Sequence, residues 1–285
     1  MINLWYEENS HLPVRGPQKV LIGLKESLEY CGVPYAINED KYKFNHLIQY
    51  GPVGHLRHEK LEHESCLIGP QVWPFDPYGE FLKDNPQYYK KLLMPGMSCY
   101  LSFIDQGYRR DKLAIWPVGI KDINIERSSE KKFLIYQKER SDQDVNFITS
   151  FLNENGYSYE ILRYGFYNPE DYYHCLQVCS HAIIVGRPET QGIAYQEMMS
   201  SNMPLLIWDN LEWYDIGIPI EYQKNPCPTS AHYFSEECGE KFYSKEEFEK
   251  IFSRFISNKY CPKDYVKREL SYEASVKKLI SIFEE

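Results

Sequence analysis

The chain has 285 residues, of which 43% are hydrophobic and 26% are charged, and its formal net charge at pH 7 is −9. This composition is typical of a soluble globular protein with about two domains. The negative charge and the lack of a long Lys/Arg run exclude nucleic acid and anionic membranes as default partners. No apolar run approaches the roughly 20 residues that cross a bilayer, so we expect no integral membrane segment.

The start of the chain and its cysteines indicate a cytoplasmic protein. Residues 1–13 lack the basic region and apolar core of a secretory signal. The eight cysteines are scattered, and none forms a Cys-x-x-Cys pair. We therefore expect reduced thiols. Cys175 and Cys179, with the adjacent His174, supply too few ligands for a metal site and are interpreted as packing residues.

Short apolar runs alternate with helical stretches in the first half of the chain, as is typical of α/β layered folds. Residues 2–6 predict a strand, and residues 19–31 predict an amphipathic helix that stops at Gly32. Gly16 lies in the loop between them, and His55 lies in a Gly/Pro-bearing loop after a further predicted strand. The remaining strands of this half are expected at residues 35–37, 46–49, 65–68 and 113–116.

The second half repeats the pattern more regularly. Strands are expected at residues 132–137, 157–162, 182–185 and 205–208. Helices are expected between them at residues 142–155, 168–178 and 191–201. Right-handed crossovers assemble such units into a parallel sheet. The tail from residue 245 predicts two helices separated by Pro262.

These elements predict an α/β fold with two Rossmann-like domains that face each other across a cleft. We expect an N-terminal domain at residues 1–118 and a C-terminal domain at residues 119–268. A helix at residues 269–285 is expected to pack back on the N-terminal domain. Ligands of open parallel sheets bind at the carboxyl ends of the strands, so the loops that follow the strands are the candidate sites.

Two glutamates stand out in the stretch RPETQGIAYQEMMSSNMPLLIWD, residues 187–209. Glu189 precedes the predicted helix and Glu197 lies in its second turn, eight positions further along, which is about 12 Å of rise if the segment is fully helical. The helix start between them offers free N–H groups and a partial positive charge, which suit a phosphate. These amides belong to Gln191, Gly192 and Ile193. An anion site between two carboxylates fits a nucleotide-sugar. Such a ligand presents its sugar hydroxyls, its diphosphate and its ribose hydroxyls in the same order.

This stretch resembles the Glu-x7-Glu motif of retaining GT-B glycosyltransferases, of the family 4 or group 1 type. Flanking segments fall in the family's order and approximate spacing, namely residues 164–165, 168–173, 188–192, 197–199 and 203–205. The likeness covers about residues 130–240. The N-terminal half matches in outline through its first strand, the loop with Gly16 and the following helix.

The resemblance implies a role for each candidate residue. Glu189 would contact hydroxyls of the transferred sugar, with the amides of residues 191–193, and Glu197 would hold the ribose. Lys138 and Arg140 resemble the family's basic pair on the diphosphate, to which Arg187 would add charge. The turn beside the base would be Tyr164, Gly165 and Phe166. The N-terminal domain would be the acceptor side, and the C-terminal domain would bind the donor.

The sequence departs from the family pattern at two places. Thr190 stands directly after the first glutamate, where the family usually has glycine. Lys138 and Arg140 are two positions apart, in the reverse of the family's usual order.

Simpler interpretations remain open for each feature. Two glutamates at this spacing also occur on solvated helix faces, and Lys138 and Arg140 also fit a mixed surface loop. Tyr164 and Phe166 also fit a hydrophobic core, Gly16 an ordinary turn, and His55 a structural or surface position.

The implied reaction transfers a sugar from a nucleotide-sugar to a glycan or other hydroxyl acceptor, with retention. Stabilising the charge that builds on the leaving diphosphate is the main electrostatic task. Lys138, Arg140 and the helix start would do this without a metal or other cofactor. Asp142 and Asp144 are two apart, but they lie at a predicted helix start and are interpreted as capping and first-turn residues. His55 would support the reaction from the N-terminal domain.

Two alternative functions are compatible with the same fold. One is a nucleotide-sugar 2-epimerase, which would need an acid/base set in the N-terminal half. The other is a catalytically silent carbohydrate-binding relative.

Overall fold

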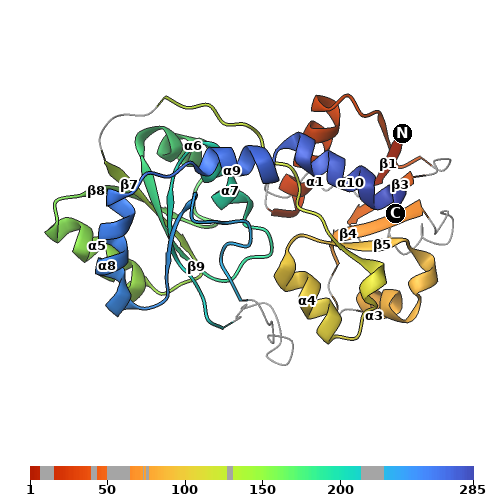
Figure 1. Ribbon diagram of the computed structural model, residues 1–285, viewed down its shortest axis with the longest axis horizontal. Helices are drawn as coiled ribbons and strands as arrows, with labels where there is room; N and C mark the ends of the chain where they lie inside the picture. The colour runs from red at the N-terminus through yellow and green to blue at the C-terminus, as the bar shows by residue number, and fades with distance from the viewer. Residues whose placement is uncertain are drawn as a thin grey trace. The chain divides into compact units, whose positions relative to one another are not determined.

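The computed structural model of the protein describes residues 1–6, 16–39, 44–49, 65–72, 74, 77–126, 131–212 and 228–285. His55 lies outside these residues. The described chain forms two units, each with its own parallel sheet (Figure 1). Of the described residues, Met1–Ile120 and Glu269–Glu285 belong to the first unit, and those between Lys121 and Arg268 belong to the second. The chain therefore divides two residues beyond the predicted boundary.

In the first unit, six described strands form a parallel sheet in the order β2-β1-β3-β4-β5-β6. These strands are β1 (Ile2–Trp5), β2 (Tyr35–Ile37), β3 (Phe44–Gln49), β4 (Cys66–Gln71), β5 (Lys91–Met94) and β6 (Leu113–Ile115). The accompanying helices are α1 (Gly16–Tyr30), α3 (Pro77–Asp84), α4 (Met97–Asp105) and α10 (Tyr272–Glu284). Two short 3-10 turns, Pro86–Tyr88 and Arg110–Lys112, precede β5 and β6. Strands β1 and β4 are buried nearly throughout, because helices cover both faces of such a sheet.

The last helix, α10, belongs to this first unit although it ends the chain. It packs on α1, where the Tyr272 hydroxyl donates to the Glu26 carboxylate and the Tyr272 ring meets Tyr30 edge-on. Ser275 Oγ donates to the Pro117 carbonyl at 2.8 Å, and Trp116 Nε1 donates to the Ser275 carbonyl at 3.1 Å. The end of the chain thus completes the core of the unit in which the chain begins.

In the second unit, five described strands form a parallel sheet in the order β11-β10-β9-β7-β8. These strands are β7 (Lys132–Lys138), β8 (Ser158–Arg163), β9 (His181–Gly186), β10 (Leu205–Trp208) and β11 (Gly239–Phe242). The helices are α5 (Asp142–Glu154), α6 (Pro169–Val178), α7 (Ile193–Ser200), α8 (Lys245–Ser257) and α9 (Pro262–Glu269). Figure 1 shows α5 and α8 on one side of this sheet, with α6 and α7 on the other. Phenylalanines of α8 join apolar side chains of α5 and the central strands in one buried cluster.

Local signals set the helix starts of the second unit. Asp142 and Asp144 lie in the first turn of α5, as predicted, but the capping residue is Ser141, which accepts the Asp144 N–H. Asn168 and Asp171 form a reciprocal capping box at the start of α6. No helix among the described residues is long and apolar enough to cross a membrane.

The prediction of two helices in the tail is wrong, because the described tail contains α8, α9 and α10. Pro262 is the first residue of α9, where its missing N–H costs nothing. Ser271 begins α10 by accepting the Ala274 N–H at 3.2 Å. Strands β5 and β11 were also not predicted. β11 reads GEKF, and two of its four residues are charged, so it lacks a continuous apolar run.

Buried His46 gives the first unit a pH-dependent stability. Its side chain is fully buried on β3, and Nε2 donates to the Gly69 carbonyl at 2.8 Å. Burial lowers the pKa of His46 from 6.5 to about 4, and the Gly69 contact opposes this only in part. The folded state therefore favours the neutral ring, while the unfolded chain takes up a proton as the pH falls below about 6.5.

We expect the free energy of unfolding to decrease by about 3 kcal/mol as the pH falls from 6.5 to 4, since each pKa unit is worth about 1.4 kcal/mol. Urea denaturation at several pH values measures this. His46→Gln should flatten the profile in this range, whereas His174→Gln, at an exposed site, should leave it unchanged. An equal slope in wild type and His46→Gln would contradict the assignment.

Candidate functional site

The carboxyl ends of three neighbouring strands in the second unit bring the candidate residues together. Lys138 ends β7 and pairs in register with Gly186, the last residue of β9. Trp208, the last residue of β10, pairs with Val185. The Arg187 N–H donates to the Lys138 carbonyl at 3.1 Å, which continues the pairing into the loop. The loop with Glu189 therefore leaves the sheet directly beside Lys138.

Lys138 and Glu189 form an ion pair with 2.5 Å between Nζ and Oε1. Their side chains are only 11% and 12% exposed. The Lys138 ammonium also lies 4.3 Å from the centre of the Tyr164 ring, a cation–π contact. The Tyr195 hydroxyl reaches the same Glu189 oxygen at 3.5 Å. Because both charges are largely withdrawn from water, each depends on the other for compensation.

The turn after β7 sends its three charged side chains to different partners. Glu139 has a positive φ of 54° and pairs with Arg187 at 2.8 Å. Gln137 Nε2 donates to the Arg140 carbonyl at 2.9 Å and so closes the turn. Lys138 is thereby held toward Glu189.

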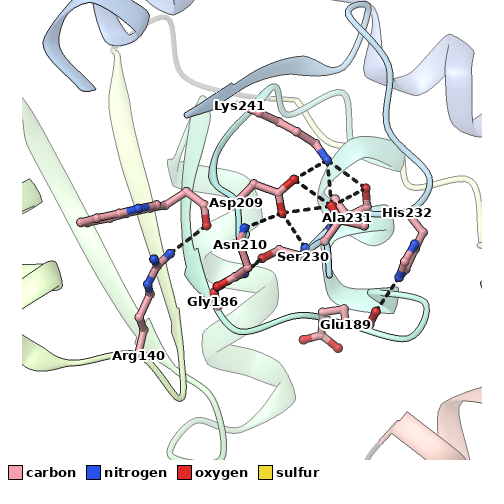
Figure 2. A network of polar contacts seen from close by, with 11 residues as sticks. Arg140, Gly186, Glu189, Asp209, Asn210, Ser230, Ala231, His232 and Lys241 are labelled. Atoms are coloured by element: carbon pink, nitrogen blue, oxygen red, sulfur yellow. Dashed lines mark hydrogen bonds and ion pairs between the residues drawn. The ribbon is translucent and has the colours of Figure 1, made fainter. Parts of the chain in front are cut away.

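Arg140 is engaged elsewhere. Its guanidinium lies 4.4 Å from the centre of the Trp208 ring and donates to the Trp208 carbonyl at 2.9 Å. Its Nε also lies 3.6 Å from Asp144. Figure 2 shows Arg140 directed to the end of β10, away from Glu189. The expected basic pair therefore divides, with Lys138 at Glu189 and Arg140 at Trp208.

The second glutamate, Glu197, lies half-buried on α7 beside a group of tyrosines. Burial raises the pKa of the Tyr172 phenol well above its usual value, and the charge of Glu197 raises it further. Burial also raises the pKa of Tyr167, with added contributions from the charges of Glu197 and Glu189. Tyr167 thus lies in the field of both carboxylates.

We call this group the tyrosine cluster, and it comprises Tyr136, Tyr164, Tyr167, Tyr172 and Tyr195. The Tyr136 and Tyr167 hydroxyls are 2.9 Å apart, and the Tyr167 ring stacks on Tyr172. Tyr172 donates to the Ala194 carbonyl at 2.7 Å and so fixes the first turn of α7. The cluster connects the end of β7 with α6 and α7.

The start of α7 depends on two glycines. Gly192 caps the helix with φ +82°, and a Cβ there would lie 3.0 Å from the Tyr195 ring. A Cβ on Gly186 would lie 2.7 Å from the Tyr195 hydroxyl. Gln196 Nε2 donates to the Gln191 carbonyl at 2.9 Å, and Gln191 Nε2 donates to Gln196 Oε1 at 2.9 Å. The helix begins at Ile193, so the amides of Gln191 and Gly192 belong to the loop rather than to the helix.

A second polar network surrounds Asp209, which follows β10 and is 3% exposed (Figure 2). Its carboxylate accepts from Lys241 Nζ at 2.7 Å, Thr229 Oγ1 at 2.8 Å and the Ser230 N–H at 2.7 Å. Asn210 Nδ2 donates to the Gly186 carbonyl at 3.1 Å and to Ser230 Oγ at 2.6 Å. We call residues 229–232 the strap, because these bonds fasten it to the ends of β9, β10 and β11.

The other predicted residues lie as follows. Thr190 and Ile193 are half-buried beside Glu189 and at the start of α7. Gly165 has φ +84°, and Phe166 after it is 81% exposed, with Arg163 6.0 Å from its ring centre. Gly16 is exposed at the first residue of α1, in the other unit, and no atom lies within 4 Å of a Cβ built on it. His55 lies outside the described residues, so its predicted role stays a prediction.

Sequence reasoning missed the residues that support the site. Asp209 and Asn210 directly follow a buried strand, and that position at a strand's carboxyl end was a usable signal. Lys241 and His232 carry no such signal, because they reach the site only through folding. Among the described residues, no group of three or more His, Cys, Asp or Glu is arranged to hold a metal ion.

Comparison with solved structures identifies the fold. The lipopolysaccharide outer core galactosyltransferase WaaB matches with a TM-score of 0.62 at 11% identity, over 99% of both chains. Anabaena HepE in complex with UDP-glucose matches with a TM-score of 0.59 at 9% identity, over 100% of this chain and 99% of its own. S. aureus TarM in a complex that includes UDP matches with a TM-score of 0.53 at 11% identity, over 93% of this chain and 59% of its own.

No protein-family model matches the sequence, and no curated protein matches it. The two parallel sheets with their helices match GT-B glycosyltransferase structures, so the predicted α/β fold of this class is confirmed. At this low sequence identity the likeness concerns the fold.

The buried Lys138–Glu189 pair should show strong energetic coupling. Lys138→Met or Glu189→Gln alone should each destabilise the protein by about 3 kcal/mol, because each leaves an uncompensated buried charge. The double variant should lose at least about 2 kcal/mol less than the sum of the two. Chemical denaturation of the four proteins measures this coupling.

The Lys132–Glu160 pair is the matched control. Its Nζ–Oε1 distance is also 2.5 Å, but its side chains are 26% and 40% exposed. Water screens that pair, so its coupling should stay below about 1 kcal/mol. Equal coupling in the two pairs would show that burial does not set the energy of the Lys138–Glu189 contact.

Proposed function

We propose that the protein is a glycosyltransferase that moves a sugar from a nucleotide-diphosphate sugar to an acceptor hydroxyl. The observation that carries the proposal is the buried Lys138–Glu189 pair. It places a cation and a carboxylate side by side where the strands of a GT-B fold end and just before α7 begins. A diphosphate and a sugar bonded to it need these two charges at neighbouring positions.

Each charge then has a task. Glu189 accepts hydrogen bonds from hydroxyls of the transferred sugar, while Lys138 turns from Glu189 to the diphosphate. The amides of residues 191–193 lie at the positive end of α7 and add to the attraction for the diphosphate. Glu197, one turn into α7, accepts from the ribose hydroxyls. Tyr164, whose ring makes the cation–π contact with the Lys138 ammonium, begins the turn that is assigned to the nucleotide base.

The chemical step breaks the bond between the sugar's anomeric carbon and the diphosphate oxygen, and forms a bond from that carbon to the acceptor oxygen. The bonding pair leaves with the diphosphate, and the acceptor proton passes to a phosphate oxygen. Lys138 stabilises the charge that builds on the leaving group. We propose that the transfer proceeds with retention and without a metal. Arg140 and Arg187 hold the turn that carries Lys138, through Trp208 and Glu139 respectively.

The donor is proposed from the solved structures that share the fold. HepE was solved with UDP-glucose and TarM with UDP, and WaaB is described as a galactosyltransferase. UDP-glucose and UDP-galactose are therefore the first donors to test, with GDP- and ADP-sugars as comparisons.

Incubation of the purified protein with each donor should release the nucleoside diphosphate, slowly without an acceptor and faster with a mixture of glycan acceptors. Release should continue in EDTA, because Lys138 and the main-chain amides of residues 191–193 carry the charge stabilisation. Chromatography of the products with the Glu189→Gln variant as control measures this.

Absence of both binding and turnover with every donor would refute the proposal. Formation of an epimerised nucleotide-sugar would instead establish the isomerase, and binding without turnover would establish the silent relative.

Substitution of Glu197 should affect mainly UDP binding, whereas substitution of Glu189 should affect mainly kcat. Glu197→Ala should weaken UDP binding by at least about tenfold, because it removes hydrogen bonds between the ribose and a charged group. Glu189→Gln should not weaken UDP binding, because it frees Lys138 for the diphosphate, and it should lower kcat by at least about 100-fold, since in the complex Glu189 contacts the sugar. Calorimetry and initial rates measure the two effects. Wild-type affinity and rate in both variants would exclude the assigned roles.

A further inference from the structure

The strap, residues 229–232, binds both the N–H and the carbonyl of the Glu189 main chain. The Glu189 N–H donates to the Thr229 carbonyl at 3.1 Å. Its carbonyl accepts from His232 Nε2 at 2.7 Å. Figure 2 shows this carbonyl directed at His232 while the carboxylate points away from the strap. The peptide groups on both sides of the Glu189 Cα are thus fixed.

The strap is itself rigidly anchored. Asp209 accepts from the Thr229 hydroxyl, the Ser230 N–H and Lys241 Nζ, and Lys241 also donates to the Ala231 carbonyl at 3.3 Å. These bonds tie the strap to the ends of β10 and β11. The Glu189 main chain is therefore held in place relative to the sheet by residues that lie far from it in the sequence.

The chemistry of His232 suits this role. A carbonyl oxygen only accepts, so His232 Nε2 carries the proton of this bond. Burial lowers the pKa of His232 and Lys241 lowers it further, while the Glu189 carbonyl and the charge of Asp209 oppose this in part. The environment therefore favours the neutral ring, which adds no positive charge that would compete with Lys138 for the Glu189 carboxylate.

We propose that His232 is a positioning residue that orients Glu189 for contact with the transferred sugar. This inference rests on the proposed function, because it assigns His232 a part in the same transfer. The Glu189 side chain meets Lys138 only if its Cα is held at one place and in one orientation. A displacement of about 1 Å at a reacting group lowers turnover by up to about 100-fold.

The test compares His232→Ala, which removes the donor, with His232→Gln, whose amide nitrogen replaces Nε2. Ser235→Ala is the control, because Ser235 lies just past the strap and donates to Glu237 rather than to Glu189. For each protein we would measure kcat with the active donor, the Kd for UDP, and hydrogen exchange of the Glu189 amide.

His232→Ala should lower kcat by at least about tenfold and speed exchange at the Glu189 amide, while the Kd for UDP stays within about twofold. His232→Gln should recover kcat to within about threefold of wild type. Ser235→Ala should behave as wild type. Unchanged kcat in His232→Ala would overturn the inference, and so would a loss of UDP affinity equal to the loss of kcat, or a His232→Gln variant as slow as His232→Ala.

The test still gives an answer if His232→Ala does not fold or if the wild type is inactive. If His232→Ala fails to fold, His232→Asn replaces it, because its shorter amide does not reach the carbonyl and it should be slower than His232→Gln. If wild type transfers no sugar from any donor, the proposed function fails. The exchange experiment still judges the contact, because unchanged exchange at Glu189 in His232→Ala overturns the inference whatever the activity.

Discussion

Lys138 and Glu189 bring opposite charges to within 2.5 Å of each other at a place where neither side chain is well hydrated. Such a pair is costly to desolvate, and it persists only where the main chain fixes both partners. The structure does so by separate means: strand register and a closed turn hold Lys138, while the strap holds Glu189. Much of the polar structure of the second unit can be understood as support for this contact.

The parallel sheet makes the arrangement possible. Adjacent strand ends bring loops that are distant in the sequence to one edge, and each loop contributes a different function. β7 supplies the cation, the loop after β9 supplies the first carboxylate, and the segment after β10 supplies Asp209, which anchors the strap. The tyrosine cluster lies between β7, α6 and α7, and the Tyr195 hydroxyl in it lies 3.5 Å from the Glu189 carboxylate. Aromatic rings suit this position because they pack densely and still offer a hydroxyl.

The sequence predicted the regular elements best where their signals are local. Alternating apolar runs and helix caps located the βαβ units of residues 132–208, and α7 began only two residues from its predicted start. Prediction failed where neighbours decide the structure. β11 is a strand because it pairs with β10, although Glu240 and Lys241 interrupt its apolar pattern. Pro262 was interpreted as a gap between two helices, but it opens a separate helix, α9.

The sequence by itself determined the α/β class, the order of strands and helices in residues 132–208, and the spacing of Glu189 and Glu197 on either side of a helix start. These features are encoded by periodicity and by residues close together in the chain. Tertiary structure alone decided that Lys138 meets Glu189, that Arg140 turns to Trp208, and that His232, Asp209 and Lys241 support the loop. The physical reason is that these contacts join separate strand ends, whose proximity follows from strand order and register and leaves no periodic trace in the sequence.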